Sequence, residues 1–208
     1  MSQYFEIHPD NPQSRLIKQA VEIINKGGVV IYPTDSSYAI GCHLGDKKAM
    51  DKIRMIRQLD KSHDFTLVCR DLSEISRYAI VDNMNYRLMK SLTPGPYTFI
   101  LPATREVPKR LLNPKRKTIG IRVPDNAVCS ELLAELDQPL MSSTLILPNQ
   151  DYPLTDPYEI RVKLENVVDL IIDGGYSGND STTVVSLTDD KPEILRQGLG
   201  SADWLTQH

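Results

Sequence analysis

The chain has few of the residues that mark several large classes of protein. Its three cysteines stand far apart in 208 residues with no Cys-x-x-Cys pair, which favours reduced thiols over a disulfide framework. The histidines have no ligand spacing with these cysteines, so we expect no zinc, and we also expect no haem or flavin. No apolar run reaches the roughly 20 residues that cross a bilayer, and the first ten residues lack a signal-peptide pattern. We therefore expect a cytoplasmic protein with no membrane partner.

Common catalytic and nucleotide-binding signatures are missing as well. There is no Gly-x-x-x-x-Gly-Lys-Ser/Thr phosphate loop, and no Gly-x-Gly-x-x-Gly follows a predicted strand. A serine hydrolase is disfavoured because the chain has no Gly-x-Ser-x-Gly elbow. Only 6% of the residues are aromatic, which disfavours recognition of single-stranded RNA by base stacking.

Apolar periodicity predicts helices that alternate with short strands. Helices are expected over 13–26, 46–57, 71–75, 82–92, 125–136 and 159–164. Strands are expected as a buried run that ends at Pro33, and over 65–69, 97–101, 118–123, 140–144, 167–172, 182–187 and 193–196. Because no linker or repeat interrupts the pattern, we expect one α/β domain over residues 1–208, with its core at about 13–198. A twisted mixed sheet flanked by helices is the predicted architecture.

Hydroxyl and guanidinium groups recur on or at the ends of the predicted strands. They are Thr34, Ser36, Thr118, Arg122, Thr144, Thr182 and Arg196. Ligands of open α/β sheets bind at strand ends, and arginine donates in a planar fork to carboxylate or phosphate. The pattern predicts a ligand that carries both groups. Ordinary β-propensity of threonine and a surface ion pair of arginine remain the alternative interpretation.

Positive charge gathers in one segment of a chain whose formal net charge is -3. The cluster includes Lys109, Arg110, Lys115, Arg116 and Lys117, whereas the C-terminal third is rich in acidic residues. This asymmetry is typical of a basic face for phosphates, although an ordinary solvated surface has the same composition.

Several motifs occur in one order along nearly the whole chain. They are Pro-Thr-Asp-Ser-Ser-Tyr at 33–38, Thr-Pro-Gly-Pro-Tyr-Thr at 93–98, Gly-Ile-Arg-Val-Pro at 120–124, Ser-Ser-Thr at 142–144, Thr-Thr-Val-Val at 182–185 and Leu-Arg-Gln-Gly at 195–198. Together they resemble the YrdC/YciO family of threonylcarbamoyl-AMP synthase-like proteins, and most of all its YciO branch. The resemblance implies the YrdC/YciO-like, double-stranded-RNA-binding type of α/β fold.

The resemblance also implies an activity. L-threonine, bicarbonate and ATP would give threonylcarbamoyl-AMP and pyrophosphate for t6A modification of tRNA at A37, with Mg²⁺ sharing the phosphate charge. No residue is assigned as catalytic. The implied threonine side consists of Thr34, Ser36, Thr118, Arg122 and Thr182. The implied nucleotide side consists of Arg57, Thr144 and Arg196.

Two family motifs are altered in this chain. The family's Lys-x-Arg falls on Arg57-Gln58-Leu59, and its Ser-x-Asn falls on Thr144-Leu145-Ile146. Loss of one polar partner to a triphosphate costs roughly 1.5 to 3 kcal/mol, so we expect weakened adenylation. A changed substrate is the other outcome of these losses.

Two further functions share the same fold. The first is binding of tRNA or double-stranded RNA without strong catalysis, for which the basic residues between 109 and 117 are candidates. The second is carbamoyl or acyl transfer on a small molecule without the adenylation step.

Overall fold

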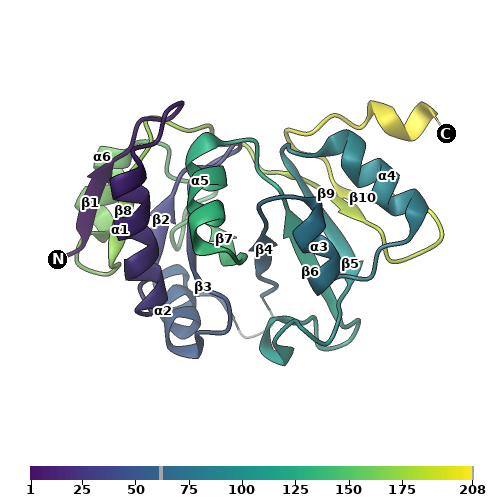
Figure 1. Ribbon diagram of the computed structural model, residues 1–208, viewed down its shortest axis with the longest axis horizontal. Coiled ribbons are helices and arrows are strands. Elements are labelled where there is room, and N and C mark those ends of the chain that lie inside the picture. The colour runs from purple at the N-terminus through teal and green to yellow at the C-terminus, as the bar shows by residue number, and fades with distance from the viewer. Residues whose placement is uncertain (61–62, 208) are drawn as a thin grey trace.

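One ten-stranded mixed sheet organises the described residues, 1–60 and 63–207, of the computed structural model (Figure 1). Its strands are β1 (Gln3–Glu6), β2 (Val30–Tyr32), β3 (Ala39–His43), β4 (Thr66–Val68), β5 (Tyr97–Pro102), β6 (Thr118–Arg122), β7 (Leu140–Thr144), β8 (Leu170–Asp173), β9 (Thr183–Ser186) and β10 (Glu193–Arg196). They follow one another across the sheet in the order β1-β8-β2-β3-β7-β4-β6-β5-β9-β10. The sheet contains both parallel pairs, such as β4–β6, and antiparallel pairs, such as β5–β6, which confirms the predicted mixed sheet.

Six α-helices and two short 3₁₀ turns connect these strands within the described part of the chain. They are α1 (Ser14–Asn25), α2 (Lys47–Arg57), α3 (Leu72–Tyr78), α4 (Asn83–Leu92), η1 (Lys109–Leu111), α5 (Ala127–Leu136), α6 (Pro157–Leu164) and η2 (Asp203–Gln207). Each α-helix matches a predicted helix to within a few residues. No helix among the described residues is both long and apolar enough to cross a membrane.

Short polar side chains start most of these helices. Asp46 accepts a hydrogen bond from the Ala49 amide at the start of α2, and Asp71 accepts from the Ser73 and Glu74 amides at the start of α3. Such caps satisfy amides that have no partner inside the helix. The predicted N-terminal positions of α2 and α3 are therefore confirmed.

Strand alternation divides the buried apolar side chains between the two faces of the sheet. Val30 and Tyr32 of β2 pack with α1 and α5, whereas Ile31 between them packs into the larger cluster on the other face. Because successive strand residues point to opposite faces, both faces of this half of the sheet are covered. Figure 1 shows α1 and α5 side by side over the half that contains β1, β8 and β2.

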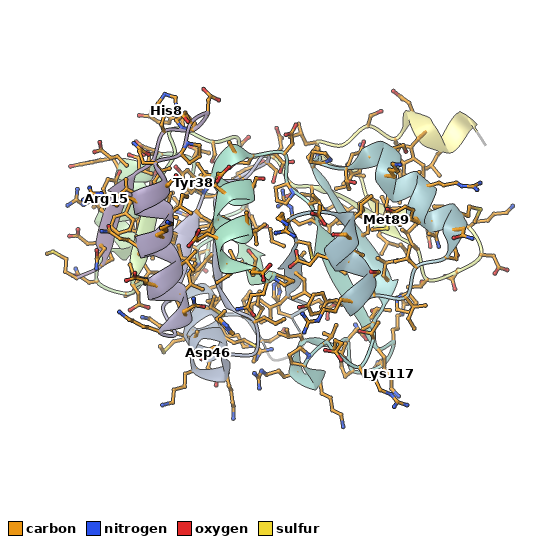
Figure 2. All side chains as sticks on the ribbon, in the orientation of Figure 1. His8, Arg15, Tyr38, Asp46, Met89 and Lys117 are labelled. Carbon is orange, nitrogen blue, oxygen red and sulfur yellow. The ribbon has the colours of Figure 1, made fainter. Side chains whose placement is uncertain are left out.

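The other half of the sheet is apolar on one face only. Met89 of α4 is fully buried against the strands, as its position in Figure 2 shows, and Phe99 of β5 and Ile121 of β6 join the same cluster. The strand residues next to them in sequence, such as Thr98 beside Phe99 and Gly120 beside Ile121, face the opposite side of the sheet. A polar sheet face is thereby available to a ligand.

Two strands are absent from the sequence prediction. β1 precedes the expected core range of 13–198, and β3 follows the turn after Pro33, where a polar loop is the expected structure. β3 pairs antiparallel with β2, with Ile40 opposite Ile31, and contains a glycine that lowers its β-propensity. Gly41 is required there, since a Cβ would lie 2.9 Å from the Met141 carbonyl oxygen of the neighbouring β7.

Candidate functional site

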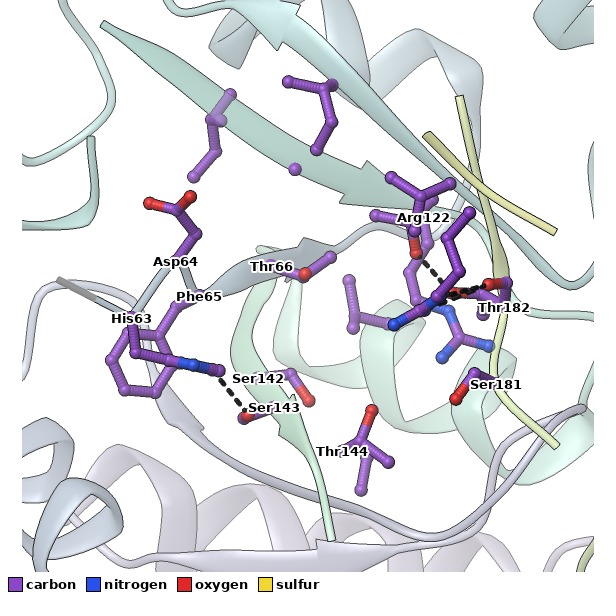
Figure 3. A pocket seen from close by; sticks show the side chains of 18 of the residues that line it. His63, Asp64, Phe65, Thr66, Arg122, Ser142, Ser143, Thr144, Ser181 and Thr182 are labelled. Atoms are coloured by element: carbon purple, nitrogen blue, oxygen red, sulfur yellow. Dashed lines mark hydrogen bonds between the residues drawn. The ribbon is translucent and has the colours of Figure 1, made fainter. Parts of the chain in front are cut away.

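A cavity of about 350 Å³ lies on the polar face of the sheet. Residues from seven strands, β3 to β7, β9 and β10, line it together with the C-terminal end of α2 and the segment before β4. Figure 3 shows the hydroxyl groups of β7, those of Ser181 and Thr182 just before β9, and the side chain of Arg122 around a common space. Segments far apart in sequence therefore form one site.

Side chains in β5 and β6 alternate between the two faces of the sheet, and those on one face form the polar floor of the cavity. Thr98 of β5, and Thr118, Gly120 and Arg122 of β6, line the cavity, while the residues between them contribute to the apolar core. A Cβ on Gly120 would approach the Thr66 hydroxyl to 3.3 Å, so glycine keeps this part of the floor open. Thr98 therefore faces away from Phe99, which lies in the apolar core.

Arg122 is a buried cation with spare donor capacity. One terminal nitrogen donates to Asp35 at 2.5 Å and to the Ser36 hydroxyl at 3.3 Å. Asp35 also accepts the Asp125 amide at 2.9 Å, which fixes the carboxylate. The Arg122 Nε atom is buried and has no hydrogen-bond partner in residues 1–60 and 63–207, an arrangement that suits an anionic ligand in the adjoining cavity.

Arg196 reaches the cavity from β10, the outermost strand. Its Nε and Nη2 atoms donate to the Thr182 carbonyl at 3.2 and 3.0 Å, and Nη2 also lies 3.3 Å from the Thr182 hydroxyl. The Thr182 hydroxyl in turn contacts the Thr98 hydroxyl at 2.8 Å. Burial lowers the pKa of Arg196, which nevertheless stays protonated at neutral pH. This chain of contacts places a second positive charge on the cavity wall.

A third cation, Arg57, lines the cavity from the C-terminal end of α2. Arg57 donates through Nε to the Ile146 carbonyl at 2.9 Å and through Nη1 to the Ser143 hydroxyl. The Ser143 hydroxyl also lies 3.2 Å from His63 Nε2, as Figure 3 shows. Burial and the nearby Arg57 charge lower the pKa of His63, so its imidazole is neutral at neutral pH.

Six of the eight predicted ligand-binding residues line the cavity, and two do not. The six are Arg57, Thr118, Arg122, Thr144, Thr182 and Arg196. Thr34 and Ser36 lie behind the wall: the Thr34 hydroxyl accepts the amides of Ser36 and Ser37 and donates to the Ser37 carbonyl. Thr34 thus stabilises its own turn, which leaves Ser37 at the cavity surface. His63 and Ser143 line the cavity without having been predicted.

The predicted basic residues lie on the loop between β5 and β6. Lys109, Arg110, Lys115, Arg116 and Lys117 are all exposed, and Figure 2 shows Lys117 at the edge of the molecule. Leu111 of the same loop lines the cavity, and the Asn113 amide donates to Asp64 at 3.4 Å. The loop therefore brings positive charge to the rim of the cavity.

Carboxylates are sparse in the cavity. Asp64 lines it, and no group of three or more His, Cys, Asp or Glu residues placed to hold a metal ion occurs in residues 1–60 and 63–207. A divalent cation at this site would take most of its oxygen ligands from a bound phosphate.

Comparison with known proteins decides the family. The model of the Sua5/YciO/YrdC family, described as "Telomere recombination", matches residues 22–198. The chain belongs to the Sua5/YciO/YrdC family. Protein YciO of Escherichia coli strain K12 is 60% identical over 200 residues, which cover 96% of this chain and 97% of YciO. The E. coli YciO crystal structure superposes with a TM-score of 0.93 at 59% identity, covering 97% of this chain and 98% of that one.

More distant Sua5/YciO/YrdC proteins include enzymes. A threonylcarbamoyl-AMP synthase of Vibrio cholerae is 25% identical over 186 residues, 88% of this chain and 97% of that protein. The structure of P. abyssi Sua5 complexed with L-threonine has a TM-score of 0.90 at 20% identity and covers 99% of this chain but 60% of that one. The Sua5 likeness supports the fold alone. The expected YrdC/YciO-like fold is confirmed, and the chain has threonylcarbamoyl-AMP synthases among its relatives.

Proposed function

We propose that this protein is a nucleotidyltransferase of the cytosol that converts L-threonine, bicarbonate and ATP into threonylcarbamoyl-AMP and pyrophosphate, at a reduced rate. The product would serve t6A modification of tRNA at A37. The observation that carries the proposal is the convergence of Arg57, Arg122 and Arg196 on one hydroxyl-lined cavity, in a fold shared with threonylcarbamoyl-AMP synthases.

Arg122 is the proposed anchor for the threonine carboxylate. Its buried Nε atom has no acceptor in the described protein, and a buried donor left unpaired costs about 1–3 kcal/mol. A carboxylate at this position would recover that cost through a charge-assisted hydrogen bond. Thr118 and Thr182 also line the cavity and offer hydroxyls to the amino acid.

Arg57, Thr144 and Arg196 are the proposed contacts to the nucleotide. The two guanidinium groups would offset phosphate charge, and the exposed cations of the β5–β6 loop would attract ATP to the rim. Magnesium would arrive bound to the ATP phosphates, since Asp64 is the one carboxylate among the described lining residues. When bound, it would supply further charge neutralisation.

The proposed reaction needs positioned charge more than a protein nucleophile. The threonine amine combines with bicarbonate to form a carbamate and water. A carbamate oxygen then attacks the α-phosphorus of ATP, and the bond to the β-phosphate oxygen breaks to release pyrophosphate. Arg57 and Arg196 would stabilise the charge that develops on the phosphate oxygens, and the enclosed cavity would strengthen that effect.

The reduced rate follows from Leu59 and Ile146. Ile146 lines the cavity with an apolar side chain where the family motif has an amide, and Leu59 packs against the core where the motif has arginine. Each lost polar contact to a triphosphate would cost roughly 1.5 to 3 kcal/mol, a factor of more than ten in rate.

Pyrophosphate release from ATP, with and without L-threonine and bicarbonate, tests the proposal. We expect slow release that requires both co-substrates. I146N is expected to raise kcat/KM about tenfold by restoring one polar contact, and the L59R/I146N pair is expected to raise it further. I146V is the matched control, because it keeps the wall apolar and should leave the rate unchanged. If the unaltered protein, I146N and L59R/I146N all fail to release pyrophosphate, the proposal is contradicted.

The basic loop favours RNA binding as a second candidate function. Its five exposed cations could contact the phosphates of a tRNA or another duplex RNA. Such binding should weaken steeply between 50 mM and 200 mM salt, because bound cations displace counterions from the phosphates. A titration at both salt concentrations measures this. Tight, salt-sensitive binding without pyrophosphate release would support RNA binding and reject the synthase.

A further inference from the structure

A serine and a histidine meet inside the cavity, apart from the proposed threonine contacts. Ser143 Oγ lies 3.2 Å from His63 Nε2, within reach for proton transfer when a substrate draws the two together. Arg57 donates to the same oxygen. Ser143 lies on β7, in the middle of the sheet, where its pairing with Ile40 of β3 holds its backbone.

The hydroxyl of Ser143 can accept from Arg57 and still donate to His63. A guanidinium can only donate, so the bond from Arg57 uses Ser143 Oγ as an acceptor and leaves the serine proton free to point elsewhere. In the neutral tautomer that carries its proton on Nδ1, His63 Nε2 accepts that proton. The His63 ring stands edge-on to Phe65, with centroids 5.5 Å apart and an angle of 84° between the planes. This contact orients the imidazole.

Burial, together with charges on two elements, keeps His63 neutral. Burial is the largest contribution and, with Arg57 and Arg54 of α2, lowers the pKa of His63 below the ordinary 6.5. Asp64 and Asp60 on its own segment act in the opposite direction and raise that pKa. His63 is thus a proton acceptor across the neutral range.

We propose that Ser143 is a nucleophile and His63 its general base, and that the pair transfers acyl or carbamoyl groups carried on a good leaving group. Activated esters and mixed anhydrides of carboxylic or carbamic acids with phosphate are the substrate class. The activity requires no ATP and stands independently of the proposed synthase reaction. Arg57 is placed to stabilise the negative charge that develops near Ser143.

The reaction would have two steps, acylation of Ser143 and hydrolysis of the acyl-serine. Ser143 Oγ attacks the carbonyl carbon and its proton passes to His63 Nε2, while the bond from carbon to the leaving oxygen breaks with its electron pair. The proton on His63 then goes to the leaving group or to solvent. Water attacks the acyl-serine with His63 again as base, which releases the acid and restores the serine hydroxyl.

The neighbouring hydroxyl of Ser142 provides a matched comparison. Ser142 also lines the cavity, but its Oγ bonds to the Tyr32 hydroxyl at 2.7 Å and to the Ile40 carbonyl. No imidazole of the described residues forms a hydrogen bond with it. The missing Gly-x-Ser-x-Gly motif does not argue against Ser143, since a nucleophile and its base are recognised by geometry.

The test uses the full chain with 4-nitrophenyl acetate and with a fluorophosphonate probe, without ATP. Nitrophenolate release and a covalent adduct on the peptide that contains Ser143 are expected. S143A should abolish the adduct and lower turnover on the order of 100-fold, and H63Q should lower turnover by a similar factor. S142A should label and turn over like the unaltered protein. Turnover should rise with pH through a pKa below 6.5 and then level off.

Several results would overturn the proposal. No adduct in the unaltered protein, an adduct that persists in S143A, or an unchanged rate in H63Q would each do so. Circular dichroism checks that the variants fold. S143C keeps a nucleophile in place, so it should still be acylated, and mass spectrometry detects the adduct. Because pyrophosphate release is measured separately, failure here would leave the synthase proposal intact.

Discussion

Arg122 and Asp35 form an ion pair almost completely removed from water, with side-chain exposures of 9% and 8%. Removing one partner leaves an unpaired buried charge, which costs about 3–5 kcal/mol. We predict that D35A lowers the free energy of unfolding by this amount in urea denaturation. D125A is the control: its side chain is exposed and only its backbone amide contacts Asp35, so a change within about 0.5 kcal/mol is expected. Equal effects of the two substitutions would contradict the prediction.

Single residues of the site were predictable where strand alternation decided their direction. Thr118 and Arg122 share one face of β6, so their place in one cavity follows from the sequence pattern. The role of Thr34 was not predictable in this way, because its hydroxyl can bind either a ligand or the backbone of its own turn, and the sequence pattern is the same in both cases. Ser143 gains its partner from a segment distant in sequence, and no local pattern indicates that contact.

At the scale of elements, the cap of α3 makes stability depend on pH. Hydrogen bonds, above all from the Ser73 hydroxyl, lower the pKa of Asp71 below its ordinary 3.8. Since the pKa is lower in the folded protein, Asp71 contributes stability above about pH 4 and loses it as the pH falls. We predict that the difference in unfolding free energy between the unaltered protein and D71N is larger at pH 6 than at pH 3. Urea denaturation at both values measures this. Equal differences at the two pH values would contradict this role of Asp71.

The helices were more predictable than the strands. Asp46 and Asp71 cap helices with clear apolar periodicity, so local chemistry alone indicates where α2 and α3 begin. β1 and β3 depend in part on neighbours that are distant in sequence: β1 pairs with β8, and β3 pairs with β7 as well as with the adjacent β2. Pairing of this kind stabilises strands whose own residues carry a weak signal.

At the scale of the whole molecule, β1 protects one edge of the sheet. It pairs with β8 and buries Phe5 and Ile7 against the α1 side. We predict that deletion of residues 2–7 costs roughly 3 to 6 kcal/mol and promotes self-association through the exposed edge of β8. Urea denaturation and light scattering measure the two effects. F5A/I7A is the matched control: it should lose stability while keeping the strand and remaining dispersed. Equal association in both variants would contradict the role of the edge.

The assembly of the cavity has a consequence for the order in which the chain is made. Ser37, near the beginning of the sequence, and Arg196, on the edge strand β10 near its end, both line the cavity. A ribosome therefore has to release almost the whole polypeptide before all three guanidinium groups can meet. A nascent chain would have its helices and half of its sheet well before the site is complete, so the full cavity forms only when synthesis is nearly finished.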